Sequence, residues 1–242
     1  MQLSLRLSAI ADMVTIGNRL VDVGCDHGYL PVYLVLNKKI PGALAMDVKK
    51  GPLSRAEEHI QQYQLSEYIE TRLSDGLAAL QPGEGDTLVI AGMGGPLMER
   101  ILQDGAPVLK NFQELILQPQ SDVGHFRRFI REQGWEITEE TIVLEDGKFY
   151  PIMKVVQKPE AERMSYTKEE ELFGKLLLDT KNAVLKQYLQ RELRIKNEIL
   201  EKLSGASKNA AQKRILEIEE EKQCIETALK RYESNRTDSL AE

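Results

Sequence analysis

Short apolar runs alternate with amphipathic stretches along the first two thirds of the chain. The runs are rich in Val, Ile and Leu, as in strands buried on both faces of a sheet, and the stretches between them space their apolar residues three and four apart, as helices do. We therefore predict strands over 19–24, 42–48, 68–73, 87–92 and 114–118, with helices over 29–36, 52–64, 96–103 and 122–133. This alternation predicts an α/β fold in which helices cover both faces of a parallel sheet.

Residues 135–156 break this rhythm. Two strand-like runs, 135–145 and 148–156, flank Asp146-Gly147, a dipeptide that favours a tight hairpin turn. A parallel sheet that ends in an antiparallel hairpin resembles the Rossmann-like sheet of class I methyltransferases, and ordinary dinucleotide-binding sheets lack that ending. Together with an amphipathic helix expected at the N-terminus, these elements predict a first domain over 1–158.

Beyond 157–159 the chain is rich in Glu, Lys, Leu and Gln and has no strand pattern. Two long helices are predicted, over 167–203 and 208–233, joined at 204–207. Their apolar residues recur three and four apart, so we expect an antiparallel coiled coil in a second domain, 159–242. The predicted seam consists of Leu185, Tyr188, Ile195, Ile199 and Leu203 in the first helix and Ile215, Ile218, Ile225, Leu229 and Tyr232 in the second, where Lys222 is the polar exception.

Charge is unevenly distributed along the chain. The net charge of −6 disfavours a nucleic-acid partner when taken alone, yet the segment 175–214 has 10 Lys and Arg against 4 Asp and Glu. Such a segment is either a phosphate-binding arm or a solvated helix face, because screening limits the reach of surface charge to about 8–10 Å. The pattern leaves both interpretations open.

Nothing in the sequence predicts export or membrane insertion. No apolar run approaches the roughly 20 residues that span a bilayer, and the N-terminus lacks the apolar core and cleavage site of a secretory signal. The two cysteines, Cys25 and Cys224, fall in different predicted domains. We therefore expect a reduced, cytoplasmic protein that is a monomer or a weak oligomer.

The first predicted strand runs into a glycine-containing turn in the segment LVDVGCDHGYLP, residues 20–31. Gly24 and Gly28 allow the backbone to approach a ligand, and the helix that follows offers free N–H groups at its N-terminus. Asp22 precedes the first glycine, and Asp26 occupies the place of a central glycine. The pattern D-x-G-x-x-x-G resembles motif I of class I methyltransferases that use S-adenosylmethionine.

Asp26 is the candidate catalytic residue, because it puts a carboxylate where the methyl group is presented. It could hold the cationic ammonium of the cofactor, accept a proton from the substrate, or cap the following helix. His27 either contacts substrate or has a structural role, and Cys25 is either a buried packing residue or a reactive thiol. The sequence leaves these alternatives open.

Two further acids follow predicted strands. Asp47 ends the second strand, 19 residues after Gly28, where a carboxylate can accept hydrogen bonds from both ribose hydroxyls of an adenosine. Asp75, in Ser74-Asp75-Gly76 after the third strand, is placed to hold the adenine amino group. Either acid could instead begin a loop or a turn, but ligand-type motifs at three successive strand ends favour an adenosine site.

The fourth strand ends in VIAGMGGP, residues 89–96. Many enzymes that methylate an amino group have an Asn or Asp side-chain acceptor here; this chain has none, so we expect a target other than an exocyclic amine. Gln118 and Gln120, at the end of the fifth strand on the same rim, are candidate substrate contacts that could shape the substrate mouth, and Arg127 and Arg128 lie beyond them, where they could contact phosphates. No Cys or His spacing predicts a metal site.

These segments together resemble the bacterial tRNA (adenine-22-N1)-methyltransferases. The resemblance rests on VDVGCDHGYLP, AMDVKKGPL, LSDGL, VIAGMGG and LILQPQS, followed by a helical-hairpin tail, and covers essentially the whole chain. It implies S-adenosyl-L-methionine as cofactor, tRNA as partner and N1 of an adenine as methyl acceptor. The cofactor-binding residues then expected are Asp22, Gly24, Cys25, His27, Gly28, Tyr29, Asp47, Val48, Ser74, Asp75, Gly76, Ala91, Gly92, Met93 and Gly94.

Adenine N1 suits this site chemically. Its in-plane lone pair can attack a sulfonium methyl with little acid–base assistance, so alignment dominates and can contribute roughly 7–11 kcal/mol. The methylated ring is cationic, so Asp26 could stabilise the developing charge. Because N1 lies on the pairing edge, the base must be unpaired or flipped out to react.

Two other functions stay open at the level of sequence. A methyltransferase acting on a small molecule or a protein would explain the first domain but leave the basic segment without a role. A non-catalytic RNA-binding module would explain that segment but leave the three adenosine-type motifs without one.

Overall fold

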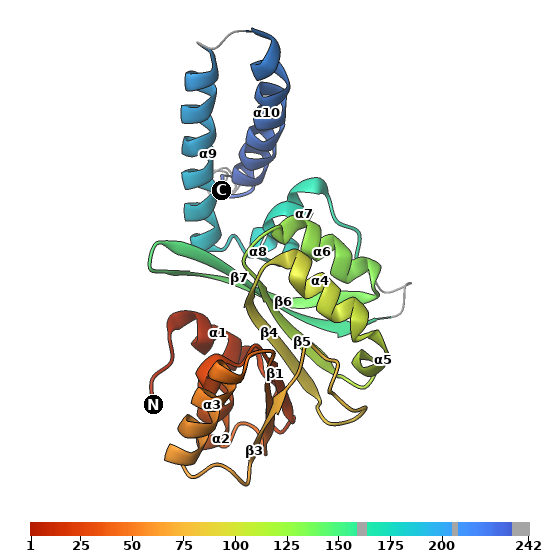
Figure 1. Ribbon diagram of the computed structural model, residues 1–242. Helices are drawn as coiled ribbons and strands as arrows, with labels where there is room; N and C mark the ends of the chain where they lie inside the picture. Colours follow the sequence, from red (N-terminus) through yellow and green to blue (C-terminus); the bar gives the residue numbers. More distant parts are fainter. Residues whose placement is uncertain (159–163, 205–207, 234–242) are drawn as a thin grey trace, which may run out of the picture. The chain divides into compact units, whose positions relative to one another are not determined.

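The computed structural model describes residues 1–158, 164–204 and 208–233 (Figure 1). The chain divides into two compact units, Met1–Met164 and Ser165–Glu242. Among the described helices, none is both long enough and apolar enough to cross a membrane.

One seven-stranded sheet forms the centre of the first unit, with the strand order β3-β2-β1-β4-β5-β7-β6. The first five strands are parallel to one another, and β7 pairs antiparallel with both β5 and β6. This confirms the predicted methyltransferase-type sheet with its closing hairpin. The strands are β1 Leu20–Val23, β2 Ala43–Asp47, β3 Ile69–Leu73, β4 Thr87–Met93, β5 Glu114–Pro119, β6 Trp135–Glu145 and β7 Lys148–Gln157.

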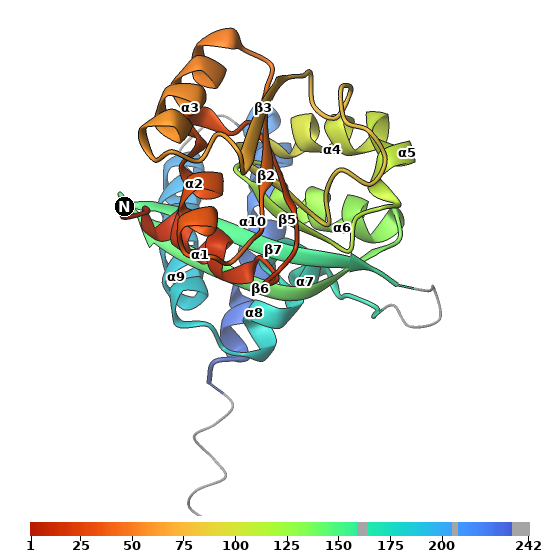
Figure 2. The same ribbon diagram turned by 90° about the horizontal axis from the view of Figure 1, so that it is seen from below.

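Helices cover both faces of this sheet. Figure 2 shows α1, α2 and α3 on one side of the strands and α4, α5 and α6 on the other. All residues of β1 and β5 are buried, which is why these strands read as nearly continuous apolar runs. The helices are α1 Leu5–Met13, α2 Tyr29–Leu36, α3 Lys50–Gln62, α4 Gly95–Asp104, α5 Ala106–Leu109 and α6 Val123–Glu132; the 3-10 turn η1 Asp26–Gly28 precedes α2.

Helix α1 is held at both of its ends. At its start, the Leu5 backbone N–H donates to Glu145 Oε1, in the β6–β7 hairpin, over 2.6 Å. At its end, Lys39 Nζ donates to the carbonyl oxygens of Ala11 (2.7 Å) and Asp12 (2.9 Å). These bonds fix the N-terminal helix against the sheet and the hairpin.

The described residues of the second unit form four helices, of which α9 and α10 pair lengthwise (Figure 1). The single helix predicted over 167–203 is wrong. Gly174 has φ +93° and Lys181 φ +50°, conformations that no α-helix contains, and Asn182 Oδ1 then accepts hydrogen bonds from the first N–H groups of a new helix. The helices are α7 Lys168–Phe173, α8 Lys175–Asp179, α9 Ala183–Ser204 and α10 Lys208–Lys230.

The paired helices bury part of the predicted seam. Leu185, Ile218 and Ile225 are buried, and Leu189 and Ala228 join them outside the predicted set. The remaining seam positions are partly exposed, which is typical of a two-helix hairpin with little third-layer cover. Residues 205–207 of the predicted connection lie outside the described residues.

Candidate functional site

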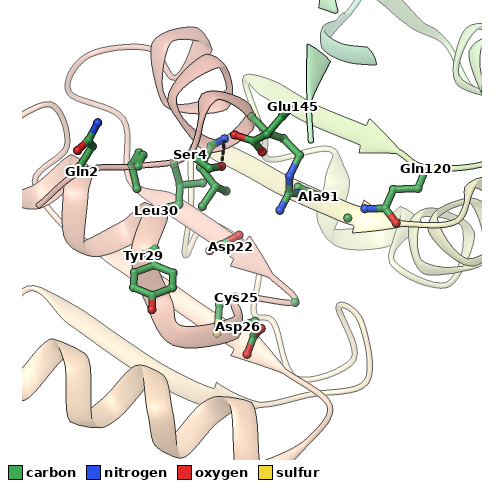
Figure 3. Close-up of a pocket in the computed structure, with 15 residues that line it drawn as sticks. Gln2, Ser4, Asp22, Cys25, Asp26, Tyr29, Leu30, Ala91, Gln120 and Glu145 are labelled. Atoms are coloured by element: carbon green, nitrogen blue, oxygen red, sulfur yellow. Dashed lines mark hydrogen bonds between the residues drawn. The ribbon is translucent and has the colours of Figure 1, made fainter. Parts of the chain in front are cut away.

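A cavity of about 560 Å³ opens at the carboxyl ends of β1 and β4. Figure 3 shows Asp22, Cys25, Asp26 and Tyr29 along one side of it and Gln120 on the opposite side. The N-terminal segment and the hairpin also contribute, through residues that include Ser4, Arg6 and Glu145. Open α/β sheets bind their ligands at this edge, where the parallel strands end.

The turn after β1 requires glycine at two positions. Gly24 has φ +78° and Gly28 φ +63°, a region that side chains rarely allow. A Cβ atom at Gly24 would collide with the side-chain methyl group of Met93, at the end of β4. No side chain caps the N-terminus of α2 at Gly28, so the turn presents backbone N–H groups beside the cavity.

Asp22 is a buried acid that faces the cavity. The residue is only 6% exposed, and its side-chain carboxyl group forms no hydrogen bond or ion pair with any described residue. Burial, and then the charge of Asp47, raise the pKa of Asp22 to about 7. A buried carboxyl group in this state favours a ligand that brings a cation or a hydrogen-bond donor.

Asp47 and Asp75 lie at the ends of the next two strands. Asp47 is buried; its Oδ1 accepts a hydrogen bond from the Lys49 backbone N–H at 2.8 Å, and Oδ2 has no partner among the described residues. Asp75 is well exposed and lies 3.9 Å from Arg100. The backbone N–H of Ser74 donates to the Asp47 carbonyl at 2.9 Å, which ties the two strand ends together. Acceptor oxygens are therefore available at both strand ends.

Asp26 forms an ion pair with Arg55 of α3. Asp26 Oδ1 lies 3.0 Å from Arg55 Nη2, and Arg55 Nε donates to His27 Nε2 over 3.2 Å. Neither η1 nor α2 has a side-chain cap, so the helix-capping interpretation of Asp26 is wrong. The Asp26 side chain is 61% exposed and lines the cavity with its charge already oriented by Arg55.

Aromatic rings and imidazoles support the turn from the side of α3. The rings of His27 and Tyr29 stack at 5.3 Å, and His59 meets Tyr29 edge-on at 4.9 Å and Tyr63 at 5.1 Å. His59 Nδ1 donates to the carbonyl oxygen of His27 over 3.0 Å. This contact holds His27 in its left-handed conformation, φ +64°. Tyr29 keeps an exposed ring at the cavity wall.

Gln118, on the neighbouring strand β5, forms hydrogen bonds that fix the end of β4. Its Oε1 accepts hydrogen bonds from the Gly92 backbone N–H (3.1 Å) and from Arg6 Nη1 (3.0 Å), and its Nε2 donates to the Pro119 carbonyl (3.1 Å). The residue is fully buried, so the prediction that it contacts the substrate is wrong. Gln120, by contrast, is exposed and lines the cavity.

Arg127 does not lie where a phosphate could reach it. The residue is 2% exposed, and its Nε donates to Glu140 Oε1, on β6, over 2.7 Å. Helix α6 places Arg127 on the same buried face as Phe126, so the predicted phosphate contact is wrong for this residue. Arg128, the next residue, is exposed. Ser74 is also buried, and its hydroxyl bonds to the Gly76 carbonyl and the Ala79 N–H within the turn.

Three charged residues of the site went unnoticed in the sequence. Arg6 reaches the cavity from α1, Glu145 from the hairpin, and Arg55 supports Asp26 from α3. Ser4 at the start of the amphipathic N-terminal segment was a helix-cap signal, and its Oγ accepts the Leu7 N–H. No sequence pattern indicated that this helix would pack on β6 and β7 and bring Arg6 to Gln118 of β5.

Comparison with known proteins shows which family this chain resembles. The family model of TrmK, tRNA (adenine(22)-N(1))-methyltransferase, matches residues 20–227. The chain is 34% identical over 209 residues to the tRNA (adenine(22)-N(1))-methyltransferase of Bacillus subtilis (strain 168), covering 86% of this chain and 88% of the relative.

Two solved structures that contain the cofactor or its product are similar to this chain. Sp1610 of Streptococcus pneumoniae in complex with S-adenosyl-L-methionine is similar with a TM-score of 0.85 and 33% identity, over 94% of this chain and 100% of that one. M. capricolum TrmK in complex with S-adenosyl-homocysteine is similar with a TM-score of 0.83 and 25% identity, over 96% and 99% of the two chains.

Proposed function

This chain belongs to the tRNA (adenine(22)-N(1))-methyltransferase family, and from that membership we propose how its own residues methylate N1 of adenine 22 in tRNA with S-adenosylmethionine as donor. The cavity at the ends of β1 and β4 is the proposed active site. The assignment rests mainly on Asp22, because a buried carboxyl group that forms no hydrogen bond or ion pair with the described protein suits a cationic ligand.

The residues around the cavity fit S-adenosylmethionine. The cofactor supplies an electrophilic methyl group on a cationic sulfur. Asp22 is placed to bind its ammonium group, and the free Oδ2 of Asp47 is placed to accept hydrogen bonds from ribose hydroxyls. Asp75 would accept from the adenine amino group. The missing side chains at Gly24 and Gly28 make room for Met93 and Ala56, and Gly24 lines the cavity with its backbone.

The remaining predicted cofactor contacts take supporting positions in this proposal. Cys25, Tyr29, Ala91 and Gly92 line the cavity. Val48 offers an exposed apolar surface just after β2, and Ser74 is buried within its own turn. The predicted contacts that are not among the residues lining the cavity are His27, Val48, Ser74, Gly76, Met93 and Gly94.

Asp26 is the proposed catalytic residue on the substrate side. Adenine N1 needs to be aligned and unprotonated rather than activated by a base, and the ring gains positive charge as it is methylated. The Asp26 carboxylate, oriented by Arg55, is suited to stabilise that charge. The absence of a side-chain amine acceptor in Ala91-Gly92-Met93-Gly94 agrees with a ring nitrogen as target.

The paired helices α9 and α10 are proposed to dock the body of the tRNA. Their segment holds the local excess of Lys and Arg, with Lys186, Lys202 and Lys213 exposed. Several other cations there pair with neighbouring acids, as Arg194 does with Glu198 at 3.9 Å. Surface pairs of this kind are worth about 0–1 kcal/mol and exchange readily for phosphate contacts. A cytoplasmic location and a monomeric or weakly oligomeric state complete the proposal.

Methyl transfer from labelled S-adenosylmethionine tests the proposed function. Wild-type enzyme should label a tRNA with adenine at position 22 and should leave the same tRNA with guanine at that position unlabelled. Labelling of a small molecule or a protein in place of tRNA would favour the alternative methyltransferase. Binding of tRNA without any methyl transfer would favour the non-catalytic module.

A further inference from the structure

Arg6 stands out among the charged residues of the cavity. Of the described residues that line it, Arg6 alone is basic, whereas Asp22, Asp26 and Glu145 are acidic. Asp26 already pairs with Arg55, and Glu145 accepts the Leu5 N–H. Arg6 itself pairs with none of these carboxylates, nor with any other described one.

The guanidinium of Arg6 is nevertheless held in place. Its Nη1 donates to Gln118 Oε1 over 3.0 Å, and its central carbon lies 5.5 Å from the centroid of the Tyr150 ring. Gln118 is fully buried, and its own amide is fixed by Gly92 and Pro119. A side chain that is anchored on a buried amide and an aromatic ring has little freedom left to lose on binding a ligand.

Gly92, near the end of β4, lies beside the guanidinium of Arg6. Gly92 has φ +78°, and a Cβ atom there would lie 3.4 Å from Arg6 Nη1. Only one of the five N–H donors of the Arg6 guanidinium forms a hydrogen bond with a described residue. A partly buried cation without a counter-ion favours an anionic group, and the planar fork of its donors matches the oxygens of a phosphate.

The surroundings of Arg6 indicate which ligand would bring that anion. Gly92, Gln118 and Tyr150 belong to β4, β5 and β7, whereas Asp47 and Asp75, the proposed adenosine contacts, follow β2 and β3. In the sheet order, β1 separates the two groups. Arg6 therefore lies away from the proposed adenosine contacts, on the side of the cavity that is shared by the methionine end of the cofactor and the incoming nucleic acid.

We propose that Arg6 binds a backbone phosphate of the tRNA beside the target adenosine, so that helix α1 helps to seat the flipped nucleotide. The inference rests on the proposed function and adds a substrate contact to it. One phosphate held this way would position the nucleotide without reading its base, because phosphate contacts set register and orientation. The other source of an anion is the carboxylate of S-adenosylmethionine, and the experiment separates the two.

The test compares Arg6→Ala and Arg6→Lys with Lys110→Ala, which removes an exposed positive charge outside the cavity. For Arg6→Ala we expect the KM for tRNA to rise at least tenfold, while the calorimetric Kd for S-adenosylmethionine stays within twofold of wild type. The log–log salt dependence of tRNA binding should become less steep by about one ion. Arg6→Lys should recover part of the loss, and Lys110→Ala should resemble wild type.

Three outcomes would overturn the proposal. A parallel tenfold loss of S-adenosylmethionine affinity would assign Arg6 to the cofactor carboxylate. Unchanged KM and salt dependence in both Arg6 variants would leave it a purely structural residue. If Arg6→Ala does not fold, an unaltered KM for tRNA in Arg6→Lys would exclude a phosphate contact that depends on the planar set of N–H donors of arginine. Each comparison requires wild-type enzyme that methylates adenine 22; inactive wild type would instead contradict the proposed function.

Discussion

The carboxyl groups of Asp22 and Asp47 lie at the ends of adjacent parallel strands, and the charge of Asp47 adds to burial in raising the pKa of Asp22 to about 7. Both residues are less than a tenth exposed. Near neutral pH, the protonated and the ionised forms of Asp22 are therefore both populated in the ligand-free protein. A cationic ligand would favour the ionised form and displace that proton.

Affinity for S-adenosylmethionine is accordingly expected to depend on pH. If only ionised Asp22 binds the ammonium group, affinity should fall by up to tenfold for each pH unit below about 7. Titration calorimetry between pH 5 and pH 8, in two buffers of different ionisation enthalpy, would measure both the affinity and the proton released. The variant Asp22→Asn should bind weakly and without this pH dependence. A flat profile for the wild type would contradict the role of Asp22.

Asp22→Asn is also expected to stabilise the ligand-free protein above neutral pH. The pKa of Asp22 is raised in the folded state above the ordinary 3.8, so the folded protein binds more protons than the unfolded chain between about pH 4 and pH 7, and stability falls as pH rises through that window. The gain for the variant at pH 8 is of order 1–4 kcal/mol. Urea unfolding of both proteins at pH 5 and pH 8 would measure it. A larger gain at pH 5 than at pH 8 would contradict the assignment.

Asp47→Ala should weaken S-adenosylmethionine binding by about 1–3 kcal/mol, because ribose hydroxyls would lose a buried acceptor. The variant also removes the acceptor of the Lys49 N–H, so its thermal midpoint should be recorded beside the affinity. Asp104→Ala, an exposed acid at the end of α4, is a matched control that should leave affinity unchanged. Wild-type affinity in a folded Asp47→Ala protein would exclude the ribose contact.

Strand patterns in the sequence were sufficient to predict the sheet because buried strands such as β1 and β5 carry short apolar runs, interrupted only by Asp22 in β1 and flanked by Glu114 and Gln118 in β5. Asp22, Asp47 and Asp75 could be placed at one edge of the sheet because parallel strands all have their carboxyl ends at the same edge. The α8–α9 break escaped prediction because Lys181, a good helix former, adopts a positive φ there.

Long-range pairing explains the errors at the rim of the site. Arg127 looks like a surface cation in sequence, and only its partner Glu140, on a different element, shows why it is buried. Gln118 likewise acquires its role from Gly92 and Arg6, which come from β4 and α1. Such contacts depend on how elements pack, and periodicity along the chain carries no information about them.

Asp26→Ala should lower the rate of methyl transfer far more than the affinity for S-adenosylmethionine, because the proposed interaction strengthens only as the adenine ring gains charge. Single-turnover rates at saturating tRNA and cofactor would isolate that step, and calorimetry would give the affinity. Arg55→Ala, which removes the partner that orients Asp26, should cause a smaller loss of the same kind. Equal losses of rate and cofactor affinity in Asp26→Ala would make Asp26 a cofactor ligand instead.

Removing the second unit should separate cofactor binding from tRNA binding. The seven-stranded sheet and its closing hairpin are complete by Gln157, and the first compact unit ends at Met164, so a chain that stops after Met164 is expected to fold and to bind S-adenosylmethionine with wild-type affinity. Its affinity for tRNA should fall, with a less steep salt dependence, because fewer phosphates are neutralised. Calorimetry and tRNA binding at several salt concentrations would measure both. Full tRNA affinity with an unaltered salt slope would show that α9 and α10 serve protein contacts or stability instead.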